Sequence, residues 1–205
     1  TPLPVEVRDS PLSIDGKTIF SAFVHDITER KQVEAIREHE ATHDPLTGLL
    51  NRRGMFNLLS QAIARVKRTR ASLALLFIDL DGFKQINDTH GHEAGDAVLR
   101  EVAARLQASI RQTDTAARLG GDEFTVILEN IKHGIPDANM LAQKILETLQ
   151  HPIQLDSVTA TISASIGISM HHPDDERSAD QLVNAADSAM YTAKHAGKNQ
   201  VCVHK

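Results

Sequence analysis

The spacing of apolar and polar positions changes along this chain, and each spacing predicts a different element. Residues 73–80 are apolar except for one aspartate, which is typical of a strand buried on both faces. From about residue 93 to residue 109 the apolar side chains recur at helical spacing, at Ala97, Val98, Val102 and Leu106. These two stretches predict a central strand and a long helix.

Turn formers and shorter apolar runs predict the other elements of this part of the chain. Asn51 can cap a helix that continues to about Lys67. We expect a short helix over 83–88, a hairpin around Gly120, a helix over 136–149, a strand over 158–170, a helix over 178–196 and a short strand at Val201. This order predicts an α+β fold with a mainly antiparallel central sheet covered by helices.

The first residues show a weaker pattern. Residues 4–9 alternate weakly, a turn signal follows at 13–18, and residues 19–24 form an apolar run. This combination predicts a β-hairpin with too little core to be stable by itself.

A charged segment follows the predicted hairpin. Asp26 and Glu29 form the pattern of a capping box, which predicts a helix over 28–42. Its few apolar residues, Val33, Ile36 and Ala41, lie on a narrow stripe. Such a stripe is typical of a helix that pairs with another helix. The alternative is a solvated linker helix without a partner.

Composition narrows the class of protein. The 205 residues are 41% hydrophobic and 24% charged, which is sufficient for one ordinary core with an appended piece. The formal net charge of −5 argues against a large nucleic-acid interface, because such domains usually carry a basic surface. A small phosphorylated ligand is compatible with this charge through local cations.

The single cysteine and the length of the longest apolar run indicate the cellular compartment in which the protein is expected. Cys202 is the single cysteine, so no internal disulfide can form, and we expect a cytoplasmic protein. Residues 73–78 are far shorter than a membrane span, so no membrane contact is expected within this sequence. The chain begins at Thr1 rather than at Met, which is typical of a fragment whose full-length form has room for an upstream membrane anchor.

The first candidate for chemistry is the segment 118–124. Gly120 and Gly121 suit the tight, positive-φ turn of a hairpin, and Asp122 and Glu123 follow them directly. Carboxylates at a hairpin tip beside two glycines could hold metal and phosphate. The alternative is an ordinary turn followed by solvated charge.

A second candidate lies where the central strand ends. Asp79 could bind a hard cation through its carboxylate, while the backbone N–H groups of Gly82, Phe83 and Lys84 could face an anion. The alternative makes Asp81 the N-cap of the next helix and leaves Asp79 as a strand-end charge.

A third candidate is the polar run over 87–96. A carboxylate such as Asp96 can accept from the ring N–H and the amino group of guanine, and Asn87 can complement the purine edge. An Asx-rich turn between helices is the alternative. His90 and His92, and likewise the pair His171-His172, lack the companions of a zinc site and are interpreted as loop histidines.

Taken together, these segments resemble the GGDEF family of diguanylate cyclases. The resemblance covers residue 44 to the C-terminus, with its motifs in order and without a gap. The motifs are residues 44–52, 79–84, 87–88, 91–92, 95–96, 120–124, 190–194 and 197–199. Residues 24–31 resemble the end of a PAS sensor domain and the start of its output helix.

The resemblance implies three parts. Residues 1–26 would be the C-terminal fragment of a PAS-like sensor domain, 27–43 a linker helix with a possible dimer coiled coil, and 44–205 the GGDEF domain. The implied fold of that domain is palm-like, similar to nucleotide cyclases. The implied reaction condenses two GTP into cyclic di-GMP and releases two pyrophosphates. Because each domain holds one GTP, the resemblance implies a homodimer in which the linker helix brings two domains face to face.

The resemblance also assigns roles to residues. Asp79, Asp122 and Glu123, with the Leu80 carbonyl, would hold two Mg²⁺ or Mn²⁺ ions per active half-site, and Asp122 or Glu123 is the candidate base. Asn87 and Asp96 would read guanine. Lys194 and Lys198, with the amides of Gly82, Phe83 and Lys84, would grip the β- and γ-phosphates. The family often has Arg at position 198, and Lys keeps the charge but loses bidentate geometry.

Arg111 and Asp114 stand at the spacing of the family's product-inhibition site. Without the resemblance, the pair is interpreted as a surface ion pair that contributes little to stability. The resemblance implies instead that Arg111 and Asp114 bind cyclic di-GMP. A second arginine is not evident, and Lys132 and Lys144 are the nearby cations.

Two other functions are weighed against an active cyclase. A catalytically weak regulatory module would bind GTP or cyclic di-GMP without turning substrate over, and the intact Asp122-Glu123 pair argues against it. A palm-type transferase acting on nucleic acid would need an aromatic-rich basic groove, whereas aromatic residues are only 3% of this chain.

Overall fold

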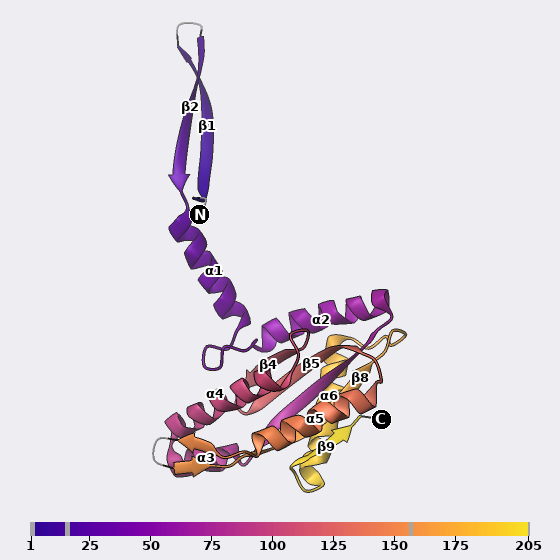
Figure 1. Cartoon of the computed structure of the whole chain (residues 1–205). Coiled ribbons are helices and arrows are strands. Elements are labelled where there is room, and N and C mark those ends of the chain that lie inside the picture. Colours follow the sequence, from indigo (N-terminus) through magenta and orange to yellow (C-terminus); the bar gives the residue numbers. More distant parts are fainter. Residues whose placement is uncertain (1–2, 15–16, 156–157, 205) are drawn as a thin grey trace. The chain divides into compact units, whose positions relative to one another are not determined.

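The computed structural model describes residues 3–14, 17–155 and 158–204. It divides into two compact units, Thr1–Ala41 and Thr42–Lys205. Figure 1 shows the hairpin and the first helix of the smaller unit, and the sheet and helices of the larger one. None of the helices in these described ranges is long and apolar enough to cross a membrane.

The smaller unit contains the predicted hairpin and helix. Strands β1 (Val5–Ile14) and β2 (Lys17–Asp26) pair antiparallel, and α1 (Thr28–Thr42) follows. The Asp26 carboxylate accepts from the Thr28 backbone N–H at 2.8 Å, a local contact two residues along the chain and not the bond to the Glu29 N–H that the predicted capping box requires. Val33 and Ile36 on α1 are 41% and 57% exposed. This unit therefore leaves its apolar stripe in contact with solvent.

The larger unit is built on a mixed sheet. In the described part of the chain this sheet has five strands in the order β4-β5-β3-β8-β9, and only the β8–β9 pair is parallel. The mainly antiparallel α+β sheet that the sequence predicted is thus confirmed. The strands are β3 (Ser72–Asp81), β4 (Thr115–Gly120), β5 (Glu123–Ile131), β8 (Ser163–His171) and β9 (Gln200–Val203).

Helices cover both faces of this sheet (Figure 1). Residues 73–78 of β3 are all apolar because both faces of the strand are covered: Leu73 and Leu75 pack with α2 and α6, whereas Leu76 and Ile78 pack with α4 and α5. The helices are α2 (Arg52–Thr69), α3 (Phe83–His90), α4 (His92–Ser109), α5 (Ile135–Leu149) and α6 (Ala179–His195).

One predicted strand was wrong in its extent. Residues 158–170 do not form a single strand, because β7 (Val158–Ala160) pairs with the unpredicted strand β6 (Ile153–Leu155) and β8 begins only at Ser163. Apolar side chains continue across the break, since Ala160 and Ile162 are both buried. Periodicity shows that such residues are buried, but it does not show which strand each one joins.

Candidate functional site

The candidate site lies where the end of β3 meets the β4–β5 turn. Gly120 and Gly121 have φ values of 144° and 54°, a conformation that side chains on L-residues rarely allow. This turn sets Glu123 directly opposite Asp79 in the β3–β5 register. The Leu80 N–H donates to the Asp122 carbonyl at 3.2 Å. Backbone pairing thus brings the acidic hairpin tip to the acidic strand end.

Asp79 is the buried carboxylate of this group, with 6% of its surface exposed. Lys194 Nζ on α6 lies 2.6 Å from Asp79 Oδ1. Burial raises the pKa of Asp79, and the charges of Asp122 and Asp81 add to this, while Lys194 opposes it. Asp79 Oδ1 is buried and, despite the close ammonium, has no donor in hydrogen-bond geometry. Such an oxygen fits a hard cation.

Glu123 is turned toward a different cation. Its Oε2 lies 3.5 Å from Arg52 NH2, at the start of α2. Within the described ranges, no three His, Cys, Asp or Glu side chains gather into a ready-made metal cluster. In this structure the carboxylates of Asp79 and Glu123 are therefore neutralised by Lys194 and Arg52. Arg52 was not singled out from the sequence, because its contact with Glu123 depends on the packing of α2 beside β5.

Asp81 does not cap α3, so the alternative interpretation from the sequence was wrong. The N-cap is Gly82, which has a φ of 82° and makes no side-chain cap bond. The Asp81 carboxylate instead accepts from Ser165 Oγ at 2.9 Å, from Ser163 Oγ at 3.0 Å and from the Asn199 N–H at 3.1 Å. These donors come from β8 and from the segment after α6.

Arg118 shapes the glycine turn. Its guanidinium donates to the Gly121 carbonyl at 2.9 and 3.0 Å and to the Asp44 carboxylate at 3.0 and 3.2 Å. Its side chain is only 12% exposed. Arg118 had no role in the sequence analysis, because its partner Asp44 lies 74 residues away. The contact connects the turn at residues 44–48 to the hairpin tip.

The candidate phosphate contacts lie at the ends of two helices. Gly82, Phe83 and Lys84 form the start of α3, directly after β3. Lys194 lies in the last turn of α6, and Lys198 follows it with a φ of 63°. The structure brings Lys194 to Asp79, and the contacts of Asp81 bring the segment of Lys198 to the same strand end.

The candidate guanine readers lie on neighbouring helices. Asn87 is on α3 and Asp96 is in the first turns of α4, and the two helices meet at Gly91. A Cβ atom at Gly95 would overlap Asn87 Oδ1. Gly95 therefore lets the Asn87 carboxamide lie directly against α4, one residue from Asp96.

Arg111 and Asp114 lie after the end of α4, and the Arg111 N–H donates to Asp114 Oδ2 at 3.2 Å. Both residues line a cavity of about 350 Å³ that also includes Met140 and Lys144 of α5. Lys144 Nζ donates to the Ser109 carbonyl at 3.0 Å. One of the two cations named from the sequence is thus already bonded to the end of α4.

The fold and this site together define a class: an α+β domain with an acidic hairpin tip beside the acidic end of its central strand, flanked by lysines. The family model described as "Diguanylate cyclase, GGDEF domain" matches residues 41–200. This chain belongs to the GGDEF diguanylate cyclase family.

Individual relatives agree with this assignment. An uncharacterized signaling protein of Caulobacter vibrioides is 41% identical over 200 residues, covering 96% of this chain and 25% of that protein. The diguanylate cyclase TpbB of Pseudomonas aeruginosa is 44% identical over 161 residues, covering 78% of this chain and 37% of that protein. The chain thus spans well under half the length of both relatives.

A solved structure extends the comparison to the fold. The coiled coil and GGDEF domain of DgcB from Caulobacter crescentus, in complex with c-di-GMP, matches with a TM-score of 0.77 and 29% sequence identity. The match covers 85% of this chain and 91% of that chain.

Proposed function

We propose that this chain condenses two GTP molecules into cyclic di-GMP and two pyrophosphates, by in-line attack of a 3′-hydroxyl on the α-phosphorus. The observation that carries the proposal is the register that sets Glu123 opposite Asp79, with Lys194 Nζ 2.6 Å from Asp79 Oδ1. Carboxylates and an ammonium at one strand end can together receive a metal-bound triphosphate. GTP is a cytoplasmic substrate, so the domain would act there.

Asp79, Asp122 and Glu123, with the Leu80 carbonyl, would hold two Mg²⁺ or Mn²⁺ ions. Bound metal would neutralise the triphosphate and lower the pKa of the attacking hydroxyl. The donor set fits, because it consists of hard oxygens and includes the buried Asp79 Oδ1, whose close partner is the Lys194 ammonium. Lys194 would then move from the Asp79 carboxylate to a phosphate of the substrate, and the ion pair between Glu123 and Arg52 would break.

The remaining side chains would bind and orient the substrate. Asn87 and Asp96 would pair with the guanine edge, and the amides of Gly82 to Lys84, with Lys194 and Lys198, would hold the β- and γ-phosphates. Support comes from Gly95, which brings the Asn87 carboxamide against α4 beside Asp96. Asp122 or Glu123 would accept the hydroxyl proton.

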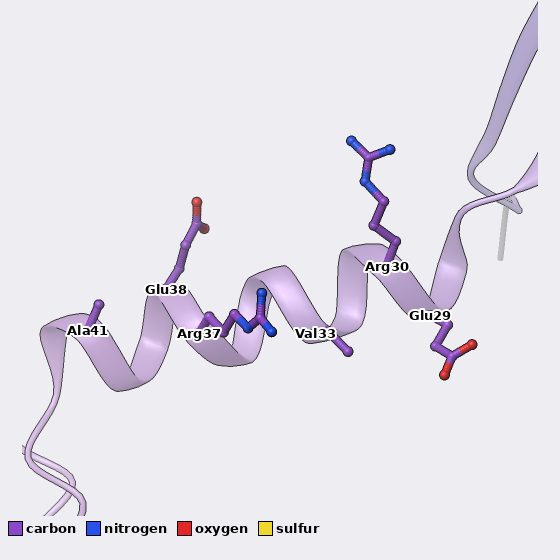
Figure 2. A pocket seen from close by; sticks show the side chains of 6 residues that line it. All are labelled: Glu29, Arg30, Val33, Arg37, Glu38 and Ala41. Atoms are coloured by element: carbon purple, nitrogen blue, oxygen red, sulfur yellow. The ribbon is translucent and has the colours of Figure 1, made fainter.

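Catalysis would take place in a homodimer, since each domain binds one GTP. We propose that residues 27–43 form the dimer coiled coil and that residues 1–26 are the end of a PAS-like sensor domain. Figure 2 shows the open surface of α1 that Val33 and Ala41 line together with charged residues of the same helix. Exposed apolar side chains flanked by charge are typical of a helix that pairs with a second copy.

Cyclic di-GMP would also bind as an inhibitor at Arg111 and Asp114. Both residues line the cavity of about 350 Å³ between α4, β5 and α5. Its mixed lining, with Arg111 and Asp114 beside the exposed Met140, suits a ligand that has phosphates and flat bases. The Arg111→Ala variant should bind cyclic di-GMP more weakly, and unchanged affinity would remove Arg111 from this site.

The deciding experiment incubates the purified chain with GTP and Mg²⁺ and measures pyrophosphate and cyclic dinucleotide. The Glu123→Ala variant should lose at least about a hundredfold in turnover, because it lacks a metal-binding carboxylate. A wild-type chain that is dimerised by a fused leucine zipper and still gives no product would refute the proposal. If that chain nevertheless binds GTP or cyclic di-GMP, the regulatory binding module is the better description.

A further inference from the structure

We infer that Asp81 is a positioning residue whose carboxylate fixes the turn at residues 197–199, and thereby the backbone of Lys198, for the terminal phosphates of GTP. The inference rests on the proposed function. It gives Asp81 a different task from Asp79, although the two side chains lie on the same face of β3.

The hydrogen bonds of Asp81 separate it from the metal-binding candidates. Three donors from two other segments converge on its carboxylate: Ser163 Oγ and Ser165 Oγ on β8, and the backbone N–H of Asn199. A carboxylate has about four acceptor positions, so most of its capacity is used. Asp79 Oδ1, two residues earlier, instead lies 2.6 Å from the Lys194 ammonium and is contacted by no donor of β8 or of the turn at residues 197–199 in the described part of the chain. The Asp81 carboxylate therefore connects β3 to β8 and to Asn199, and we assign it no metal ion.

The turn that Asp81 holds needs outside support. Lys198 and Asn199 have φ values of 63° and 46°, a left-handed conformation that non-glycine residues rarely adopt. Such a conformation persists only where surrounding contacts fix it. Besides the bond to Asp81, the Lys198 N–H donates to the Ala193 carbonyl at 3.1 Å, and the Asn199 side chain accepts from Gln150 Nε2 at 2.7 Å.

Among the hydrogen bonds of residues 3–14, 17–155 and 158–204, only the one from the Asn199 N–H to Asp81 connects this turn directly to β3, the strand that carries Asp79. The contact with Ala193 lies within the end of α6, and Gln150 follows α5. Together with the β8–β9 pairing that begins at Gln200, Asp81 therefore fixes the position of the Lys198 backbone relative to Asp79. In the described part of the chain Lys198 is exposed and forms no ion pair, whereas Lys194 pairs with Asp79. The Lys198 ammonium is consequently available to an anion, and fixing its backbone lowers the entropy lost when the anion binds.

The test measures affinity for two nucleotides by calorimetry in the presence of Mg²⁺: a non-hydrolysable GTP analogue and GMP. Asp81→Ala should weaken binding of the GTP analogue about tenfold, the scale of one charge-assisted contact, and change GMP affinity less than about twofold. GMP has no β- or γ-phosphate, so a shifted Lys198 does not affect it. Equal weakening for both nucleotides, or none for either, would overturn the inference.

Two matched variants sharpen the comparison. Ser163→Ala removes one donor from the same carboxylate oxygen that accepts from Asn199, and it should leave both affinities within about twofold. Asp81→Asn keeps an acceptor for the Asn199 N–H and should fall between wild type and Asp81→Ala. If Asp81→Ala does not fold, Asp81→Ser replaces it, because a serine hydroxyl is too short to reach the Asn199 N–H.

A double-mutant cycle tests whether Asp81 acts through Lys198. Once Lys198→Ala has removed the ammonium, adding Asp81→Ala should cost less than about a further twofold for the GTP analogue. Losses that multiply would show that Asp81 acts by another route and would refute the inference. A wild-type chain that binds the GTP analogue no better than GMP would instead refute the proposed function.

Discussion

Single residues at the end of β3 show how the site accommodates negative charge. Asp79 is 6% exposed, and Asp81 lies two residues away on the same strand face. Asp81 accepts three hydrogen bonds, whereas the charge of Asp79 is compensated by Lys194. Burial alone would lower the pKa of Lys194, but contact with Asp79 and the charges of Asp122 and Asp81 raise it, so the ammonium form is favoured. Lys194 is thus charged, so it can bind either Asp79 or a phosphate.

Asp79→Asn should stabilise the metal-free fold and abolish turnover. The pKa of Asp79 is raised above its usual value by burial, so the ionised carboxylate costs the folded state free energy at neutral pH. A neutral amide removes this cost, so the melting temperature of the variant should rise above that of wild type. Thermal unfolding in EDTA measures the gain.

The sign of the same shift gives a pH test. Because the pKa of Asp79 is higher in the folded state than in the unfolded state, the folded wild type becomes protonated at Asp79 before the unfolded chain does as the pH falls. Protonation then removes the cost of the buried charge from wild type. The advantage of Asp79→Asn should therefore shrink toward acidic pH. A variant that melts below wild type at pH 7 would mean that the lost pair with Lys194 outweighs the relief of buried charge.

At the scale of elements, the connection from β8 to α6 holds the helix that supplies Lys194. Arg177 donates to the Asp175 carboxylate, to Ser169 Oγ and to the Met170 carbonyl, and Ser178 caps α6 with a full capping box. His171 is fully buried, and its Nδ1 lies 3.4 Å from Asp175 Oδ2. The Asp175 carboxylate thus contacts both Arg177 and His171 within this connection.

Asp175→Asn should destabilise the fold by about 2 kcal/mol at pH 7, which is the free energy equivalent of its pKa shift. Hydrogen bonds from Arg177 lower the pKa of Asp175 from 3.8 to about 2, and its side chain is 14% exposed. The folded pKa is depressed, so this stabilisation is present above pH 3.8 and is lost as the pH falls toward 2. Urea unfolding at pH 7 and at pH 3 measures both values. An equal difference at the two pH values would contradict the assignment.

At the scale of the whole molecule, the larger unit and the small N-terminal unit differ in how much apolar surface they bury. The larger unit encloses two apolar clusters, one on each face of β3. The smaller unit leaves Val33, Ile36 and Phe23 exposed. Exposed apolar side chains of this kind are typical of an association surface.

Turnover per mole of protein should therefore rise with protein concentration. A double variant Val33→Glu/Ile36→Glu places like charges on the apolar stripe and should shift the half-maximal concentration upward by at least about tenfold. Fusing a leucine zipper ahead of α1 should restore activity to this variant. Sedimentation and rate assays over the same concentrations measure both effects. Turnover that is independent of concentration and of these substitutions would remove α1 from the dimer.

The α+β class, the order of the main elements and the family could all be predicted from the amino-acid sequence. These features depend on local patterns: residues 73–78 of β3 are apolar because both faces of the strand are covered, and the Gly120-Gly121 turn depends on two adjacent residues. The tertiary structure was needed to show which polar groups form hydrogen bonds with each other. The pairs Arg118–Asp44 and Asp81–Asn199 join residues 74 and 118 positions apart. Such contacts depend on strand register and helix packing, which no local pattern of residues encodes.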